Sequence, residues 1–168
     1  MIDLLSDYCK KIELDITDTQ LQQFDDYYRF LVEKNKVMNL TTIIEKEDVV
    51  LKHFIDSIYI MKYTDFNEKK VIDIGTGAGF PGIPLAIMNP QTSFVLLDSL
   101  NKRINFLNEV CNLCNLSNVI TIHGRAEEIS RKEEYREKFD FVVSRAVANM
   151  STLLEYCTPF LKVGGQFI

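Results

Sequence analysis

The feature of this sequence that most constrains its fold is a short apolar run that passes directly into a glycine-rich turn. Residues 71–74 read Val-Ile-Asp-Ile, and residues 75–82 read Gly-Thr-Gly-Ala-Gly-Phe-Pro-Gly. The apolar run has the length and composition of a buried strand, and helical spacing follows the turn. Glycine permits positive φ angles and lets a ligand lie directly against the backbone. A strand, turn and helix in this order predict an α/β fold with a ligand site at the turn.

The rest of the chain repeats this alternation of short apolar runs and helical segments. We expect strands at residues 71–74, 93–97, 119–122, 139–143 and 166–168, and helices at about 83–88, 102–114, 126–136 and 150–161. Such alternation is typical of parallel βαβ units in a sheet that helices cover on both faces. Right-handed crossovers then give a doubly wound, Rossmann-like parallel sheet. Its ligand should lie beyond the carboxyl ends of the strands.

Before residue 67 the periodicity is helical. Thr17 and Gln20 have the spacing of a capping box, and an apolar stripe follows it at Leu21, Phe24, Tyr28 and Leu31. A second helix is expected from about Glu45 to Tyr63, and the segment 35–41 between the two helices is interpreted as a loop. The polar stretch 66–70 therefore divides the chain into an N-terminal helical segment, residues 1–66, and a sheet-forming domain, residues 67–168.

Composition limits the classes of function. The chain has 168 residues and a formal net charge of −5, so sequence-blind nucleic-acid binding, which needs a basic excess, is disfavoured. No run approaches the roughly 18 apolar residues that a membrane-spanning helix needs, and the N-terminus lacks the regions of a secretory signal. We expect a cytoplasmic protein that does not contact a membrane; a monomer is favoured, although the sequence leaves the oligomeric state open.

Cys111 and Cys114 have the spacing of a redox pair or of two metal ligands. A zinc site would need a second pair of Cys or His nearby, and none follows. Redox pairs usually begin a helix, whereas this pair lies late in an expected one. We interpret both residues as thiols on a buried helix face, and we expect no metal site.

Two cofactor classes use a glycine turn of this kind. The dinucleotide fingerprint is G-x-G-x-x-G, but its third glycine position falls on Phe80. Here the pattern is Gly75-x-Gly77-x-Gly79, with Asp73 two residues before it, and it is similar to the first motif of S-adenosylmethionine methyltransferases. The similarity implies backbone contact with the methionine part of the cofactor and a carboxylate near its amino group. A tight turn without a ligand remains an alternative.

Asp98 and Ser99 follow the second expected strand. Asp98 lies near the spacing, about 20 residues beyond the turn, at which an acidic residue binds ribose hydroxyls. A carboxylate accepts hydrogen bonds from two hydroxyls at once, which suits a vicinal diol. The alternative is a helix N-cap, for which Asp and Ser are both well suited.

More polar residues follow the third and fourth expected strands. Residues 125–128, Arg-Ala-Glu-Glu, stand where a methyltransferase holds the adenine ring, and the alternative is an acidic pair that stabilises a helix N-terminus. Arg145 ends the fourth strand, where it could bind a phosphate or a base edge or be a surface charge.

Together these segments resemble the RsmG family (glucose-inhibited division protein B), which methylates small-subunit ribosomal RNA. The matching segments run in family order from Asn35 to Gly165 and comprise residues 35–41, 53–57, 73–84, 97–103, 125–128 and 144–146. The most specific are the Gly-Phe-Pro-Gly turn at 79–82 and the His-Phe-Ile-Asp-Ser segment at 53–57.

The resemblance implies a methyltransferase that uses S-adenosylmethionine to modify N7 of a guanine in 16S ribosomal RNA of the small subunit. The cofactor contacts that we expect are Gly75, Gly77, Gly79, Phe80, Asp98, Ser99, Ala126, Glu127 and Arg145. N7 carries a free lone pair, so the reaction needs positioning rather than a general base, and we assign no catalytic residue. The family continues beyond Ile168 with further strands, so the sheet is expected to be incomplete here.

Several interpretations stay open. RNA contacts are expected from Lys102, Arg103, Arg125 and Arg145, each of which is more often a solvated charge, and Phe80 could stack on the target base. His53 and Asp56 either fix the N-terminal helices to the sheet or face the substrate. A small-molecule methyltransferase and a non-catalytic nucleotide-binding module remain alternatives, whereas Phe80 disfavours a nicotinamide dehydrogenase.

Overall fold

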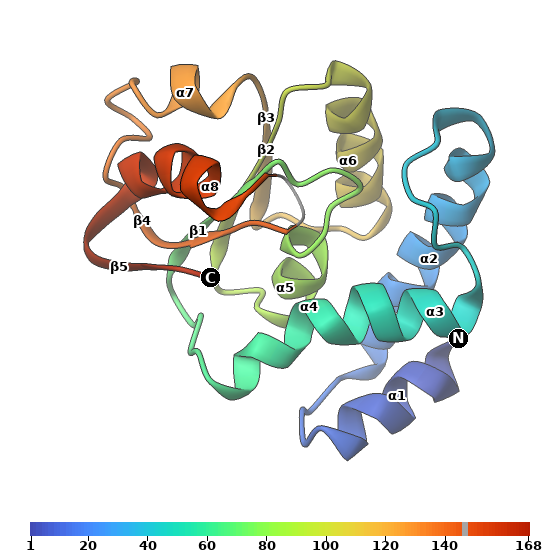
Figure 1. Cartoon of the computed structure of the whole chain (residues 1–168). Coiled ribbons are helices and arrows are strands. Elements are labelled where there is room, and N and C mark those ends of the chain that lie inside the picture. The colour runs from blue at the N-terminus through green and yellow to red at the C-terminus, as the bar shows by residue number, and fades with distance from the viewer. Residues whose placement is uncertain (146–147) are drawn as a thin grey trace.

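The computed structural model describes residues 1–145 and 148–168, and within them the chain forms a five-stranded parallel sheet covered by helices (Figure 1). The strands are β1 (Lys70–Ile74), β2 (Ser93–Asp98), β3 (Val119–His123), β4 (Phe139–Val143) and β5 (Leu161–Phe167). They lie in the order β3-β2-β1-β4-β5, and every neighbouring pair is parallel. The order reverses at β1, which confirms the expected doubly wound sheet and places its switch point between β1 and β4.

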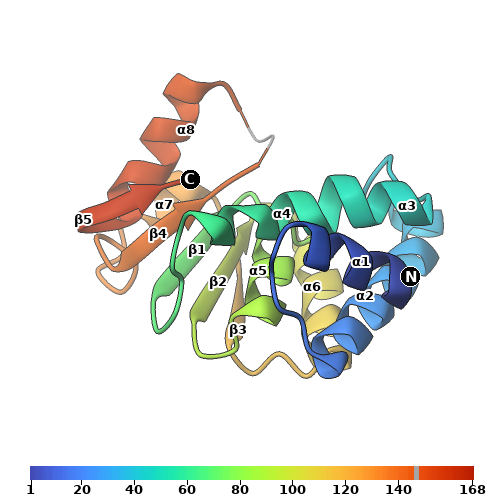
Figure 2. The ribbon, with the colours of Figure 1, turned by 90° about the horizontal axis from the view of Figure 1, so that it is seen from below.

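Helices cover both faces of the sheet (Figures 1 and 2). One face carries α5 (Gly82–Met88), α6 (Asn101–Leu113) and the N-terminal helices, and the other carries α7 (Ala126–Ile129) and α8 (Met150–Cys157). Successive strand residues point to opposite faces. Leu96 therefore joins the core under α5 and α6, while Val95 and Leu97 join the core under α7 and α8.

The N-terminal segment consists of helices joined by short loops. It comprises α1 (Ile2–Lys11), α2 (Asp18–Met38) and a continuous helical stretch made of α3 (Lys46–Val49), a π-helix (Val50–Ile55), α4 (Asp56–Ile58) and a 3-10 turn (Tyr59–Lys62). The capping box of Thr17 and Gln20 is confirmed at the start of α2. These helices share one hydrophobic core with α5 and α6, so the N-terminal segment is built into the sheet domain rather than standing apart from it.

Two predictions for the N-terminal segment were wrong in part. The segment 35–41 was expected to be a loop, but α2 continues to Met38 and ends at Asn39, which is left-handed with a φ of 49°. The buried aromatic of the α2 stripe is Tyr27, which is 0% exposed, rather than Tyr28, which is half-buried. Spacings of three and four residues both fit a helix face, so the sequence pattern could not choose between adjacent tyrosines.

The expected elements after β3 also differ in length. The helix expected to reach residue 136 ends at Ile129, because the charged segment 131–134 is exposed and offers no apolar stripe to bury. The helix after β4 ends at Cys157 and tightens into a 3-10 turn (Thr158–Phe160), so β5 begins at Leu161, earlier than expected.

The four cysteines are free thiols. Cys114 is buried and Cys111 is half-buried near the end of α6, and burial raises the pKa of these thiols to about 12 and about 11. Their interpretation as thiols on a helix face is confirmed. Among residues 1–145 and 148–168, no helix combines the length and the apolar character that crossing a bilayer requires.

Candidate functional site

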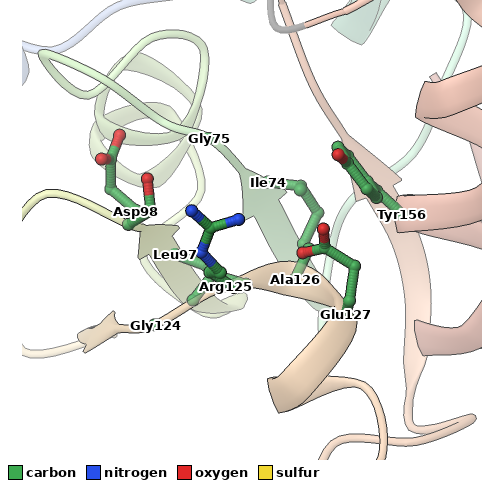
Figure 3. Close-up of a pocket in the computed structure, with 10 residues that line it drawn as sticks. Ile74, Gly75, Leu97, Asp98, Gly124, Arg125, Ala126, Glu127 and Tyr156 are labelled. Atoms are coloured by element: carbon green, nitrogen blue, oxygen red, sulfur yellow. The ribbon is translucent and has the colours of Figure 1, made fainter.

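A pocket opens at the carboxyl ends of β1, β2 and β3 (Figure 3). The structure brings together there most of the side chains and backbone that the sequence analysis singled out: Gly75, Asp98, Ser99, Ala126 and Glu127. Figure 3 shows Arg125 and Glu127 reaching into the space between Asp98 and Tyr156. The pocket therefore lies where a doubly wound sheet binds its ligand.

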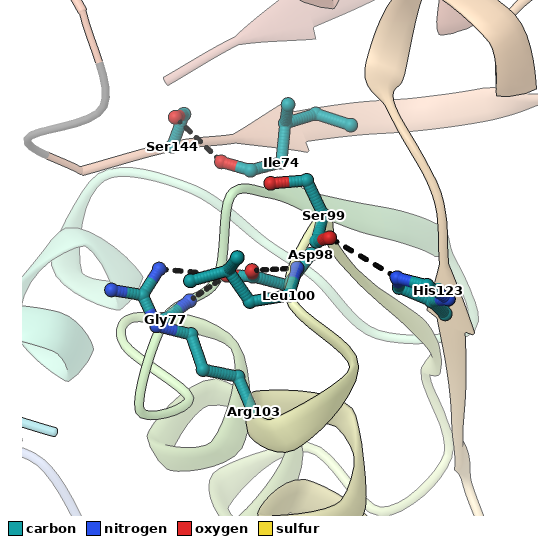
Figure 4. Close-up of polar contacts among 8 residues, drawn as sticks. All are labelled: Ile74, Gly77, Asp98, Ser99, Leu100, Arg103, His123 and Ser144. Atoms are coloured by element: carbon teal, nitrogen blue, oxygen red, sulfur yellow. Dashed lines mark hydrogen bonds and ion pairs between the residues drawn. The ribbon is translucent and has the colours of Figure 1, made fainter. Parts of the chain in front are cut away.

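Asp98 is the buried carboxylate of this pocket, with 2% of the residue exposed. Its Oδ2 accepts hydrogen bonds from the backbone N–H of Gly77 at 2.9 Å and from Nη1 of Arg103 at 3.3 Å (Figure 4). Its Oδ1 accepts one from the backbone N–H of Leu100 at 2.9 Å. Because a carboxylate has about four acceptor positions, one position on Oδ1 remains for a ligand hydroxyl. The long contact with Arg103 could yield a second.

The alternative that Asp98 caps the next helix is wrong. The first turn of α6 follows Leu100 and has no side-chain cap. The bond from the Leu100 N–H to Asp98 instead closes a local Asx turn. The carboxylate thus shapes the loop between β2 and α6, and the residue lines the pocket.

The glycine turn after β1 requires its glycines. Gly75, Gly77 and Gly79 have φ angles of 68°, 62° and 103°, which residues with a Cβ adopt only with strain. The turn is held to the sheet because the backbone N–H of Gly75 donates to the carbonyl of Leu97 at 2.8 Å. Its shape is therefore fixed by backbone conformation and by β2.

Tyr27 of α2 supports the turn from the opposite side. Its buried hydroxyl donates to the carbonyl of Ala78 at 2.5 Å. A Cβ on Gly79 would lie 2.8 Å from this hydroxyl oxygen and 2.7 Å from Cγ1 of Ile83, whereas a Cβ on Gly77 would meet only a backbone oxygen at 3.9 Å. Gly79 is thus needed for packing, and Gly77 leaves bare backbone next to open space.

This contrast gives a prediction about stability. Gly79→Ala should lower the free energy of unfolding by about 3 kcal/mol, because it adds both overpacking and backbone strain. Gly77→Ala is the matched control and should cost only about 1 kcal/mol, the penalty of a left-handed alanine. Urea unfolding of both variants measures the difference. Equal costs would contradict the distinct roles of the two glycines.

Asp73, at the β1 end, is completely buried. Its Oδ2 accepts a hydrogen bond from the backbone N–H of Gly82 at 2.9 Å, at the start of α5. Burial raises the pKa of Asp73 to about 7, although the Thr76 hydroxyl and the Gly82 N–H act in the opposite direction. The carboxylate of Asp73 thus bonds to the start of α5. Its expected contact with a cofactor amino group stays a prediction.

Arg145 follows β4 and turns toward the N-terminal helices. Its Nη1 lies 2.6 Å from Oδ2 of Asp56, and its Nη2 lies 3.1 Å from Nδ1 of His53. These contacts agree with the interpretation that His53 and Asp56 fix the N-terminal helices to the sheet. Ala146, the last residue of the expected Ser-Arg-Ala segment, lies outside the described residues.

Phe80 lies beside these residues and outside the pocket. Its ring is 6% exposed, stacks on His53 with 4.3 Å between ring centroids, and has the guanidinium of Arg145 5.3 Å from its centroid. A base could stack on Phe80 only if His53 or Arg145 moved. Stacking of a target base on Phe80 therefore stays a prediction that needs such a movement.

Residues 20–168 match the family described as GidB, rRNA small subunit methyltransferase G. The chain belongs to this family. The Ribosomal RNA small subunit methyltransferase G of Desulforamulus reducens is 51% identical over 165 residues, which cover 98% of this chain and 69% of that protein. The protein of the same name from Clostridium perfringens strain 13 is 53% identical over 167 residues, covering 99% and 70%.

The fold comparison agrees with the family. A crystal structure from Methanococcus maripaludis, titled as that of an S-adenosyl-L-methionine-dependent methyltransferase, superposes with a TM-score of 0.61 at 19% identity and covers 83% of this chain and 60% of that chain. The expected fold of a class I methyltransferase with an N-terminal helical extension is confirmed. This member of the rRNA small subunit methyltransferase G family is therefore an enzyme that transfers methyl groups.

The cations expected to contact RNA occupy different environments in this methyltransferase. Lys102 is exposed at the start of α6, and Arg125 reaches into the pocket. Arg103 and Arg145 are engaged within the chain by Asp98 and Asp56. Their contact with RNA remains a prediction.

Sequence reasoning missed two residues of the site of this methyltransferase. Tyr156 of α8 lines the pocket opposite Asp98 (Figure 3), and Tyr27 of α2 supports the glycine turn. Each comes from a helix distant in sequence from the glycine motif. The apolar stripe of α2 was a signal for Tyr27, but this pattern fits Tyr28 equally well.

Proposed function

We propose that this chain transfers the methyl group of S-adenosylmethionine to N7 of a guanine in 16S ribosomal RNA of the small subunit. The observation that carries the proposal is the pocket itself. Bare backbone, a carboxylate and a polar strand end meet there, in a chain of the rRNA small subunit methyltransferase G family. The curated relatives named for ribosomal RNA methylation match nearly the whole chain, which spans about 70% of the Clostridium perfringens protein.

The described residues fit the cofactor. Gly77 leaves open space where a side chain would otherwise stand, so the methionine part can lie along the turn at Gly75 and Gly77. Asp98 keeps an acceptor position on Oδ1 for a ribose hydroxyl. Ala126 and Glu127, at the start of α7, border the same pocket and would hold the adenine ring.

Methyl transfer to N7 requires the chain to bind and orient the cofactor and the guanine, and it does not require the chain to move a proton. Bound S-adenosylmethionine supplies an electrophilic methyl group on a sulfonium. Guanine N7 is an acceptor with a free lone pair, so no side chain has to deprotonate it. Alignment of two reactants in one geometry is itself a large source of rate enhancement.

A second candidate function follows from the same pocket. A small-molecule methyltransferase would share the cofactor site, and the chain's net charge of −5 gives no general attraction for RNA. Binding to isolated small ribosomal subunits distinguishes the two candidates, since a small-molecule enzyme has no reason to bind them.

Methyl transfer tests the proposal directly. The protein is incubated with S-adenosylmethionine labelled in its methyl group and with small subunits that lack the modification. We expect labelled N7-methylguanine after nuclease digestion of the 16S RNA. Subunits that already carry the modification are the matched control and should take up no label. Label confined to small molecules, or no label in 16S RNA, would contradict the proposal.

A further inference from the structure

Arg145, His53, Asp56 and Phe80 form a group, the Arg145 cluster, that lies between the end of β4 and the N-terminal helices. Arg145 donates from Nη1 to Oδ2 of Asp56 at 2.6 Å and to the Lys52 carbonyl at 3.3 Å. Its Nη2 lies 3.1 Å from Nδ1 of His53. The guanidinium and the imidazole both lie against the ring of Phe80. The cluster thus orients one guanidinium through contacts on several sides.

The contact with Arg145 determines the tautomer of His53. A guanidinium can only donate, so Nδ1 must carry a lone pair and the proton must sit on Nε2. The Nε2 atom lies 3.0 Å from the hydroxyl oxygen of Thr41, which can accept this proton. The imidazole is 9% exposed, and burial and the charge of Arg145 lower the pKa of His53 to about 4. His53 is therefore a neutral acceptor at neutral pH.

The position of His53 in its helix is itself unusual. It lies in the π-helix (Val50–Ile55), a rare geometry that occurs often at functional sites. The same π-helix supplies the Lys52 carbonyl that accepts from Arg145. A short irregular stretch of the N-terminal segment thus presents two acceptors, side by side, to one arginine.

The cluster stands at the switch point of the sheet. Ser144 at the end of β4 donates its hydroxyl to the carbonyl of Ile74 at 2.8 Å, which fixes the residue before Arg145 against the end of β1 (Figure 4). The side chain of Arg145 is 28% exposed. Three of its five N–H donors have the partners given above, and the others make no hydrogen bond with the described residues. With respect to the described residues, the guanidinium is held in place and keeps further N–H donors without a partner.

We propose that His53 is a positioning residue, a neutral imidazole that orients Arg145 so that its remaining N–H groups face the target nucleotide. The inference rests on the proposed function, because it takes the RNA contact expected of Arg145, and not its expected cofactor contact, as the one that forms beside the pocket. His53 itself touches neither cofactor nor RNA. Substitution of His53 should therefore affect methyl transfer only through Arg145. A purely structural role for this buried histidine would not make the effect depend on Arg145.

Three variants of His53 separate its two hydrogen bonds. His53→Asn keeps an acceptor near the position of Nδ1, His53→Gln keeps a polar group near the position of Nε2, and His53→Phe keeps only the ring against Phe80. Each is combined with Arg145→Ala, and kcat and KM are measured with labelled S-adenosylmethionine and unmodified small subunits. Melting temperatures show which variants fold.

His53→Phe should lower kcat by about 10- to 100-fold, the range expected when a reacting group is misplaced by about 1 Å, with little change in the KM for S-adenosylmethionine. His53→Asn should recover most of this loss and His53→Gln should not. In the Arg145→Ala background, His53→Phe should cost less than about 2-fold, since coupled residues are not additive.

Equal losses from His53→Phe in both backgrounds would overturn the proposal, as would recovery by Gln to the same extent as by Asn. If His53→Phe does not fold, the comparison of Asn with Gln decides alone, because both are polar and smaller than the imidazole. Failure of the proposed function is distinguishable, since the wild-type protein would then leave 16S RNA unlabelled.

Discussion

Asp98→Ala is expected to raise the Kd for S-adenosylmethionine by about 100-fold, because hydrogen bonds to a charged group contribute about 1.5–3 kcal/mol each and every 1.4 kcal/mol is tenfold in affinity. Asp98 lines the pocket and is buried, so water cannot replace its carboxylate well. It also holds the N–H groups of Gly77 and Leu100. Its loss would therefore loosen the loops on both sides of the ribose position.

The contact between Asp98 and Arg103 supplies a matched control. Arg103→Leu removes the guanidinium that lies 3.3 Å from Oδ2 and leaves the carboxylate free to accept a second ribose hydroxyl. The affinity should then stay within about 3-fold of wild type or improve. Isothermal titration with the cofactor measures both variants. An unchanged Kd for Asp98→Ala would remove Asp98 from the binding site.

The central part of the fold could be predicted from sequence because it depends on local patterns. Apolar runs such as 71–74 and 93–97 alternate with helical spacing, and the glycine turn follows β1 directly. Parallel strands then require covered faces and right-handed crossovers. The ends of elements were less predictable, as the short α7 (Ala126–Ile129) shows. Charged residues are compatible with a helix by propensity, but they bury no apolar side chain that would stabilise one.

The pocket could be predicted only in part. Gly75, Asp98, Ser99, Ala126 and Glu127 meet because each lies at or shortly after the end of a strand, and parallel strands end at one edge of the sheet. Gly77 and Gly79 shape the turn, whereas Phe80 and Arg145 lie in the neighbouring cluster and do not line the pocket. Whether these residues touch a cofactor stays a prediction.

The sequence indicated that His53 and Asp56 could fix the N-terminal helices to the sheet, but it did not identify the atoms that these helices contact. Tyr27 supports the turn through the Ala78 carbonyl, and His53 orients Arg145. Both contacts join residues more than 50 positions apart in sequence. Hydrophobic periodicity predicts which face of a helix is buried, but it does not predict which polar atoms that face contacts.

The free energy of unfolding should depend on pH between about 4 and 7, and Asp73 should make the largest contribution. Burial raises the pKa of Asp73 from 3.8 to about 7. Between these values the folded chain keeps a proton that the unfolded chain has lost, so the free energy of unfolding falls as pH rises and levels off above about 7. His53 acts in the opposite direction, because its pKa falls from 6.5 to about 4 and its contribution to stability rises with pH between these values.

Asp73→Asn should therefore be close to wild type in stability near pH 4 and more stable near pH 7, by about 4 kcal/mol for a pKa shift of about three units. The amide keeps an acceptor for the Gly82 N–H and cannot ionise, so the buried charge is removed without a change in shape. Urea unfolding across this pH range measures the effect. His53→Phe is the mirror control and should make the decline of stability with pH steeper, because the opposing histidine is gone. Parallel curves for Asp73→Asn and wild type would show that the buried carboxyl does not titrate in this range.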